Sequence, residues 1–132
     1  MPLKEIGARV NLSVSAVAER VQRMEEEGII VGYAAKIDYD RVGCPLHLMV
    51  SILGAKDRTA INDIKERVPE VIQYWTVTGD TDYLVELAVP TRSRMEEVIR
   101  VLEKIGMTKT HLVIYKDLPG REKAAIFSGQ EK

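Results

Sequence analysis

The sequence predicts an α+β protein in which a helical hairpin precedes a four-stranded antiparallel sheet with the element order βαββαβ. Three observations carry this prediction. Apolar residues recur at helical spacing in the first thirty positions, with one break. From residue 45 onward the pattern alternates between strand-like and helix-like periodicity. Between them lies the polar stretch DYDRVGC, residues 38–44, which we interpret as a linker between two domains.

The first domain, residues 1–37, begins with two helices joined by a short turn at VNLS. Ser13 suits the N-cap of the second helix, and Gly28 can end that helix in a left-handed conformation. The buried stripes of the two helices are expected to be Leu3, Ile6 and Val10, then Val17, Val21 and Met24. Beyond them, IIVGYAAKI (29–37) alternates apolar and small or polar residues, which predicts a linking strand.

The second domain, residues 45–132, supplies the six elements of a ferredoxin-like fold. A strand with alternating apolar residues starts at Leu46, and a helix follows that stops before Pro69. Two strands, about 71–78 and 82–89, flank a bend, and a second helix is ended by Gly106 before a last strand at 108–116. The helix stripes are Ile61, Ile64 and Val68, then Met95, Val98, Ile99, Leu102 and Ile105.

In this topology both helices cover one face of the sheet, and the other face is left open. The open face is expected to be unusually apolar, because its positions include His47, Met49, Leu53, Tyr74, Leu84, Val113 and Tyr115. A contiguous apolar patch usually marks an interface, so we expect the sheet of a second copy to cover it in a symmetric dimer. The alternative is an ordinary scatter of apolar surface residues.

Composition excludes several other functions. With 19 basic and 20 acidic residues, bulk attraction to phosphates or to a membrane is not indicated, and no apolar stretch is long enough to span one. Cys44 is the single cysteine, and His47 and His111 lie far apart, so neither a disulfide nor a metal site is expected. We see no catalytic constellation, predict neither an enzyme nor a cofactor, and take a reducing cytoplasm as the default location.

The helical hairpin fits a DNA-reading unit whose second helix enters the major groove, although any helical hairpin shares the pattern. The candidate DNA-binding residues are Ser13, Ser15, Ala16, Glu19, Arg20 and Arg23. Basic and acidic side chains are equal in number over residues 1–36, which is weak for a phosphate binder. We therefore predict weak binding to double-stranded DNA.

The chain resembles the leucine-responsive and asparagine-operon (Lrp/AsnC, or feast/famine) transcriptional regulators. The resemblance lies in LSVSAVAERVQRMEEEGIIVGYAAKID, in VTGDTDYLVEL and in THLVIYKDLPG, which occur in the family's order. It implies a winged helix-turn-helix, a ferredoxin-like effector domain, dimers through the sheets with assemblies up to an octamer, and amino acids as effectors. The family begins with a further helix before the stretch aligned with LKEIGARV, so the helix-turn-helix is expected to be incomplete at its start.

The bend in TVTGDTDYLVEL, residues 76–87, is the candidate effector site. As a plain turn it needs no function, since Gly79 accepts positive φ and the aspartates can cap local amides. The exposed amides could also hold a carboxylate while Asp82 pairs with an α-ammonium group. The resemblance implies Thr78, Gly79 and Asp82, with Asp80 beside them, as effector-binding residues.

Two alternatives to an effector-responsive regulator stay open on the sequence. One is a ligand-sensing or assembly module that no longer reads DNA. The other is an enzyme similar to the haem-biosynthesis decarboxylases, which share this two-part architecture.

Overall fold

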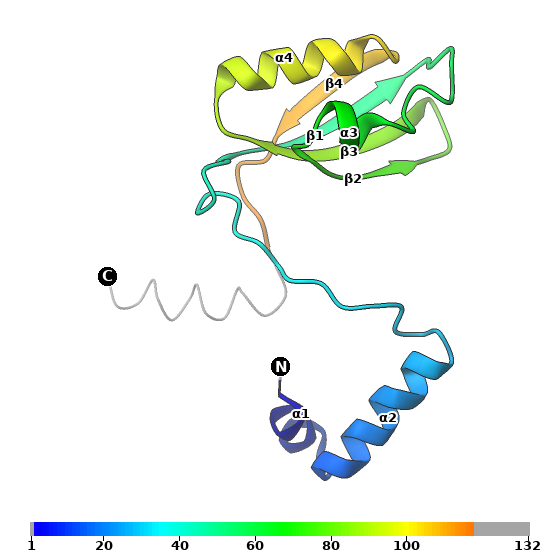
Figure 1. The fold of residues 1–132 in the computed structure, drawn as a ribbon, viewed down its shortest axis with the longest axis vertical. Helices are drawn as coiled ribbons and strands as arrows, with labels where there is room; N and C mark the ends of the chain where they lie inside the picture. The colour runs from blue at the N-terminus through cyan, green and yellow to red at the C-terminus, as the bar shows by residue number, and fades with distance from the viewer. Residues whose placement is uncertain (1, 118–132) are drawn as a thin grey trace. The chain divides into compact units, whose positions relative to one another are not determined.

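A computed structural model describes residues 2–117 of the chain (Figure 1). The chain divides between Ile37 and Asp38 into two compact units, which are described separately below. The last residues of the expected effector domain, with the LPG end of the third stretch of resemblance, lie outside the described range. No helix in residues 2–117 is long and apolar enough to cross a membrane.

The first unit is a helical hairpin, as predicted. Helix α1 (Leu3–Val10) ends at Asn11, whose φ of 57° is left-handed, and α2 (Val14–Glu26) follows. Ser13 caps α2 by accepting a hydrogen bond from the amide of Ala16 at 3.2 Å, and Gly28 has a φ of 76°. Of the predicted buried stripes only Val17 is buried, with Gly7 beside it, while Leu3 and Val10 are exposed, so the hairpin has a very small core.

The predicted strand at 29–37 does not form in the described structure. Residues 31–38 have no regular secondary structure, and their apolar side chains face solvent, with Val31 95% and Tyr33 76% exposed. A strand requires a hydrogen-bonded neighbour, and the helical hairpin has no sheet edge to offer one. The alternating pattern therefore occurs in this segment without the strand pairing that the prediction assumed.

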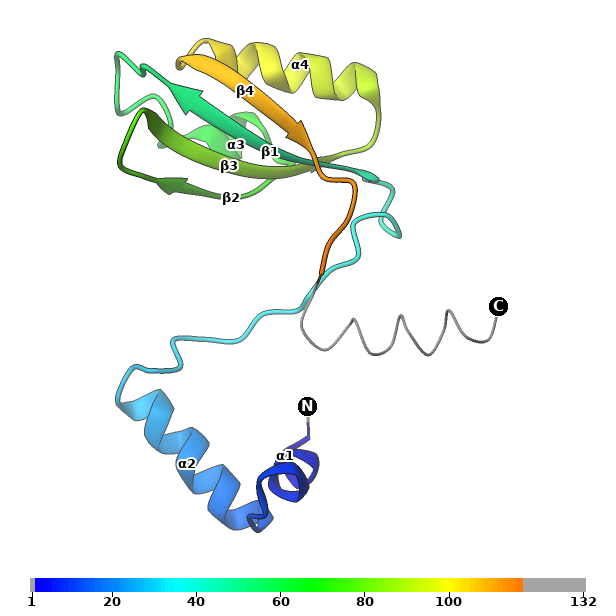
Figure 2. The same cartoon turned by 180° about the vertical axis from the view of Figure 1, so that it is seen from behind.

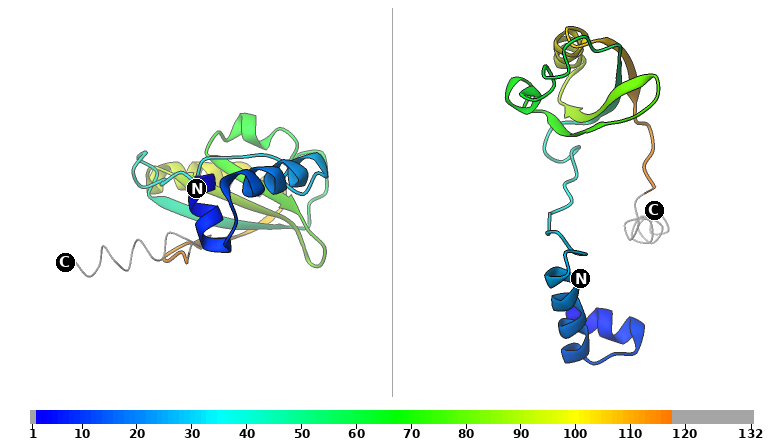
Figure 3. Two further views of the ribbon diagram at one scale, coloured as in Figure 1. Left: turned by 90° about the horizontal axis from the view of Figure 1, so that it is seen from below. Right: turned by 90° about the vertical axis from the view of Figure 1, so that its right-hand side faces the viewer.

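The second unit has the predicted order βαββαβ. Its elements are β1 (Leu46–Leu53), α3 (Ile64–Arg67), β2 (Val71–Thr76), β3 (Thr81–Val89), α4 (Arg92–Glu103) and β4 (Met107–Leu112). The strand order is β2-β3-β1-β4, and every neighbouring pair is antiparallel. Figure 1 and the right-hand view of Figure 3 show α3 and α4 on one face of this curved sheet, and Figure 2 shows the other face without a helix.

The core lies between that sheet face and the two helices. Most of the predicted stripe residues are buried there: Leu48, Val50 and Ile52 from β1, Ile61, Ile64 and Val68 around α3, and Val98, Leu102 and Ile105 around α4. Met95 and Ile99 of the predicted α4 stripe are only half-buried. Helix α3 is shorter than expected, since turns replace its first residues. Removing apolar area of this kind from water supplies roughly 25 cal/mol per Å².

Tyr74 was expected on the open face but lies on the core face, packed against the buried cluster. The register shifts between Val71 and Gln73, which leaves Ile72 unpaired in β2. Such a bulge inverts the alternation of every later residue in the strand. As a result Trp75, not Tyr74, lies opposite Leu84 on the open face.

Two further segments differ from the expected elements. Strand β4 ends at Leu112, although the amide of Val113 still donates to the carbonyl of His47 at 2.8 Å, and Tyr115 is 77% exposed beyond it. Residues 38–44, where we expected a linker, form a turn closed by a 2.8 Å hydrogen bond from the amide of Cys44 to the carbonyl of Tyr39.

Candidate functional site

The bend between β2 and β3 places most of the candidate effector residues in solvent. The amide of Val77 donates to the carbonyl of Asp82 at 3.0 Å, which closes the bend. At its tip Gly79 has a φ of 102°, a conformation that favours glycine. Thr78, Gly79 and Asp80 are all exposed, so a small molecule can reach their main chain.

Asp82 is placed differently from the other three. The register between β1 and β3 shifts between Ile52 and Leu53, leaving Asp82 without a paired residue in β1. Its Oδ2 accepts a 2.8 Å hydrogen bond from the amide of Ala55, in the loop that follows β1. The Asp82 side chain is half-buried, and its carboxylate already accepts a hydrogen bond from the loop after β1.

The loop after β1, residues 54–60, is the element that the sequence did not assign to the site. It begins with Gly54 at a φ of 65°. Within it, the amide and hydroxyl of Thr59 donate to Asp57, which lowers the pKa of that carboxyl, with the hydroxyl as the larger cause. The hydroxyl of Tyr83 donates to the carbonyl of Arg58 at 3.0 Å. The loop thus lies beside the bend and is fixed to β3 at two points.

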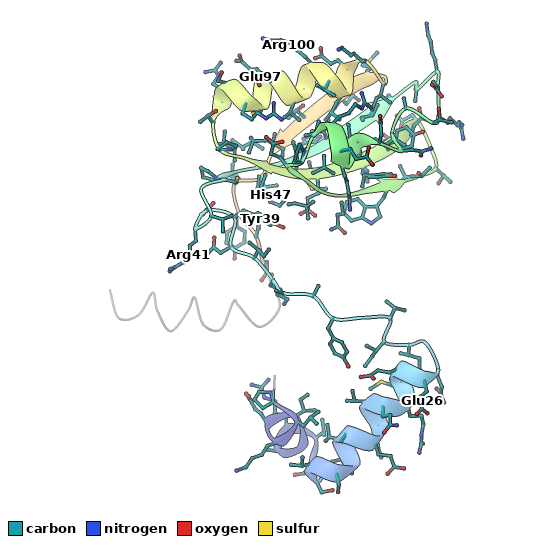
Figure 4. All side chains as sticks on the ribbon, viewed as in Figure 1. Glu26, Tyr39, Arg41, His47, Glu97 and Arg100 are labelled. Carbon is teal, nitrogen blue, oxygen red and sulfur yellow. The ribbon has the colours of Figure 1, made fainter. Side chains whose placement is uncertain are left out.

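A polar cluster occupies part of the open sheet face. Glu86 accepts 2.7 Å hydrogen bonds from His47 Nε2 and from Gln73 Nε2 on the neighbouring strands. His47 Nδ1 is buried and has no hydrogen-bond partner among residues 2–117. Figure 4 shows His47 on the side of the sheet opposite Glu97 and Arg100 of α4. Glu86 and Gln73 were not singled out from the sequence, because a polar residue in a strand usually indicates a solvated face.

The candidate DNA-binding residues lie on α2 and at its N-cap. All except Ala16 are exposed. Arg23 lies 3.4 Å from Glu19, an exposed ion pair that offsets part of its charge. Ser13 serves as the cap, with its hydroxyl 3.3 Å from that of Ser15. The basic side chain on this helix without a hydrogen bond or ion pair in the described structure is Arg20.

The exposed carboxylate of Asp80 lies at the bend with the exposed main chain of Thr78 and Gly79, and carboxylates and backbone amides can satisfy the two charges of an amino acid. No group of three or more His, Cys, Asp or Glu side chains within residues 2–117 could hold a metal ion.

Comparison with known proteins adds independent findings. Residues 48–119 match the family model for the Lrp/AsnC ligand-binding domain, and residues 1–31 match a winged helix-turn-helix DNA-binding model. The transcriptional regulator LrpA of Mycobacterium tuberculosis is 30% identical over 115 residues, covering 85% of this chain and 76% of the relative. The regulator Zrp of Zymomonas mobilis is 36% identical over 94 residues, covering 68% of this chain.

A solved structure of the feast or famine regulatory protein from M. tuberculosis, in complex with L-methionine, is also similar. It has a TM-score of 0.68 and 28% identity, and the match covers 90% of this chain and 84% of the other. The match with Zrp spans only 61% of that relative's length.

Proposed function

This chain belongs to the Lrp/AsnC family of transcriptional regulators, and from that premise we propose that a free amino acid held at the 76–82 bend controls its assembly. The observation that carries the proposal is the bend itself, where Thr78, Gly79 and Asp80 are exposed beside the fixed loop 54–60. The L-methionine complex of the related M. tuberculosis protein supports an amino acid as the ligand class.

The open sheet face connects this site to assembly. Trp75 is 41% exposed opposite Leu84, and Met107 at the edge strand is 68% exposed. A second copy that covers these apolar side chains would remove them from water. An effector that binds one assembly more tightly than another shifts the population toward it, and with it the spacing of the DNA-reading heads.

Light scattering and thermal unfolding of the full chain with a panel of amino acids test this proposal. L-Methionine is the first probe, and the expected result is a raised melting temperature together with a changed mass. N-acetyl-L-methionine lacks the ammonium group and L-methioninamide lacks the carboxylate, so each should give a smaller shift. An unchanged melting temperature with every amino acid would contradict an amino-acid effector.

For the DNA-reading half, we propose that α2 enters the major groove and that these 132 residues bind DNA weakly. The balanced charge of the hairpin and the Glu19–Arg23 pair support weak binding, since affinity for DNA depends strongly on released counterions. A gel-shift titration at several salt concentrations measures it, with Arg20→Ala expected to weaken it further. Tight, sequence-specific binding by this chain would refute the proposal.

A further inference from the structure

The half-buried carboxylate of Asp82 holds the loop after β1, whereas the neighbouring carboxylate of Asp80 holds no described residue. We propose that Asp82 is a positioning residue that fixes loop 54–60 beside the bend, and that Asp80 meets the ammonium group of the effector. The positioning role of Asp82 rests on the structure of this chain alone. The contact between Asp80 and the effector rests on the proposed function.

The geometry of β3 explains how Asp82 reaches the loop. A bulge re-aims the side chain of the extra residue, and Asp82 is the residue that the register shift leaves unpaired. The hydrogen bond from the Ala55 amide is 2.8 Å long, and a carboxylate acceptor makes such bonds roughly twice as strong as neutral ones. The Ala55 side chain also packs against the buried core. Ala55 is therefore held both by this packing and by the hydrogen bond to Asp82.

The adjacent residue provides a second attachment. Tyr83 is 3% exposed, and its hydroxyl donates to the carbonyl of Arg58. Two consecutive residues of β3 therefore hold the start and the middle of the same loop, one by accepting from an amide and the other by donating to a carbonyl. The loop and the bend should consequently behave as one unit.

The exposed carboxylate of Asp80 is the one we assign to the effector's ammonium group. An effector ammonium at Asp82 would have to reach the second oxygen of a half-buried carboxylate whose Oδ2 already accepts from the Ala55 amide. Asp80 is exposed at the tip and makes no hydrogen bond or ion pair with the residues that the structure describes. An ammonium group can approach it without breaking a contact with any residue that the structure describes.

Hydrogen–deuterium exchange on peptides spanning residues 53–57 tests the positioning role without any ligand. Asp82→Ala removes the acceptor and should accelerate exchange of the Ala55 amide about tenfold or more. Asp82→Asn keeps a carbonyl acceptor and should change it by less than about threefold. Equal exchange in the wild type and Asp82→Ala would overturn the positioning role.

Thermal unfolding with L-methionine then separates the two aspartates. We expect Asp82→Asn to keep the wild-type melting shift and Asp80→Asn, which removes only a charge, to lose most of it. The reverse pattern would overturn the assignment of the ammonium contact to Asp80. If the wild type shows no shift with any amino acid, the proposed function and the Asp80 assignment fail together, while the exchange result still decides the role of Asp82.

Discussion

Arg94 and Glu70 form a two-pronged ion pair that ties the first turn of α4 to the residue just before β2. Arg94 Nη2 lies 3.0 Å from Glu70 Oε1, and Arg94 Nε donates to the other carboxylate oxygen. The same guanidinium also donates to Glu97 at 3.0 Å. Glu70 is only 18% exposed in its side chain, so this pair is better shielded than the exposed ion pairs on α2 and α4.

Arg94→Ala should therefore lower the free energy of unfolding by about 1–2 kcal/mol, because a forked, partly shielded pair contributes more than an exposed one. Urea denaturation measures the change. Arg92→Ala is the matched control, since Arg92 lies in the same helix turn and pairs with Glu96 at 3.5 Å while 85% exposed. The Arg92→Ala control should lower the free energy of unfolding by less than about 0.5 kcal/mol. Equal losses for both variants would contradict the larger contribution of the Arg94–Glu70 pair.

The same pair predicts a pH dependence. The hydrogen bonds from Arg94 hold the pKa of the Glu70 carboxyl below its ordinary value, with burial opposing them. The unfolded chain then takes up this proton first as the pH falls, near pH 4.3. The stability that Glu70 contributes is thus fully present above that pH and is lost as the pH falls through the lowered folded-state pKa.

Comparing the wild type with Glu70→Gln isolates this contribution from that of Asp57, whose pKa is also lowered. The difference in unfolding free energy between the two proteins should shrink from pH 6 to pH 3. A constant difference over that range would show that Glu70 gains nothing from its charge.

Gly106 permits the close approach of β4 to β1. A Cβ at this position would overlap the carbonyl oxygen of Leu53 and press on the side chain of Ile52. Gly106→Ala should destabilise the second unit by more than about 2 kcal/mol, because backbone rather than a flexible side chain must move. Gly43→Ala is the control, since a Cβ added there would meet open space and only the φ of 82° is unfavourable, at roughly 1–2 kcal/mol. Thermal unfolding of both variants checks the ranking.

Periodicity in the sequence was sufficient to predict the order of the elements and most of the core. It could not locate the two bulges, since nothing in IQYW or TDYL marks an extra residue. That is why Tyr74 was assigned to the wrong face, and why the contact between Asp82 and Ala55 was not foreseen. The Ala55 amide is a backbone donor, so no side-chain pattern could have indicated it.

The segment 29–37 shows a different limit on what the sequence can predict. Its alternation is real, yet a strand depends on a neighbour that the same unit does not contain. Similarly, Glu86 lies on the open face as a polar residue, and only the structure shows it bridging His47 and Gln73.

A last prediction concerns the open sheet face, where Trp75 is the single tryptophan of the chain and lies opposite Leu84. If a second copy covers this face, Leu84→Glu should reduce the mass seen by light scattering and shift Trp75 emission to the red, because a buried charge opposes association and leaves the indole in water. Ser93→Glu adds the same charge on the exposed start of α4 and should change neither quantity. If wild-type Trp75 emission is already red-shifted and does not depend on protein concentration, the open sheet face is exposed to solvent. The proposed link between the 76–82 bend and assembly would then have no physical basis.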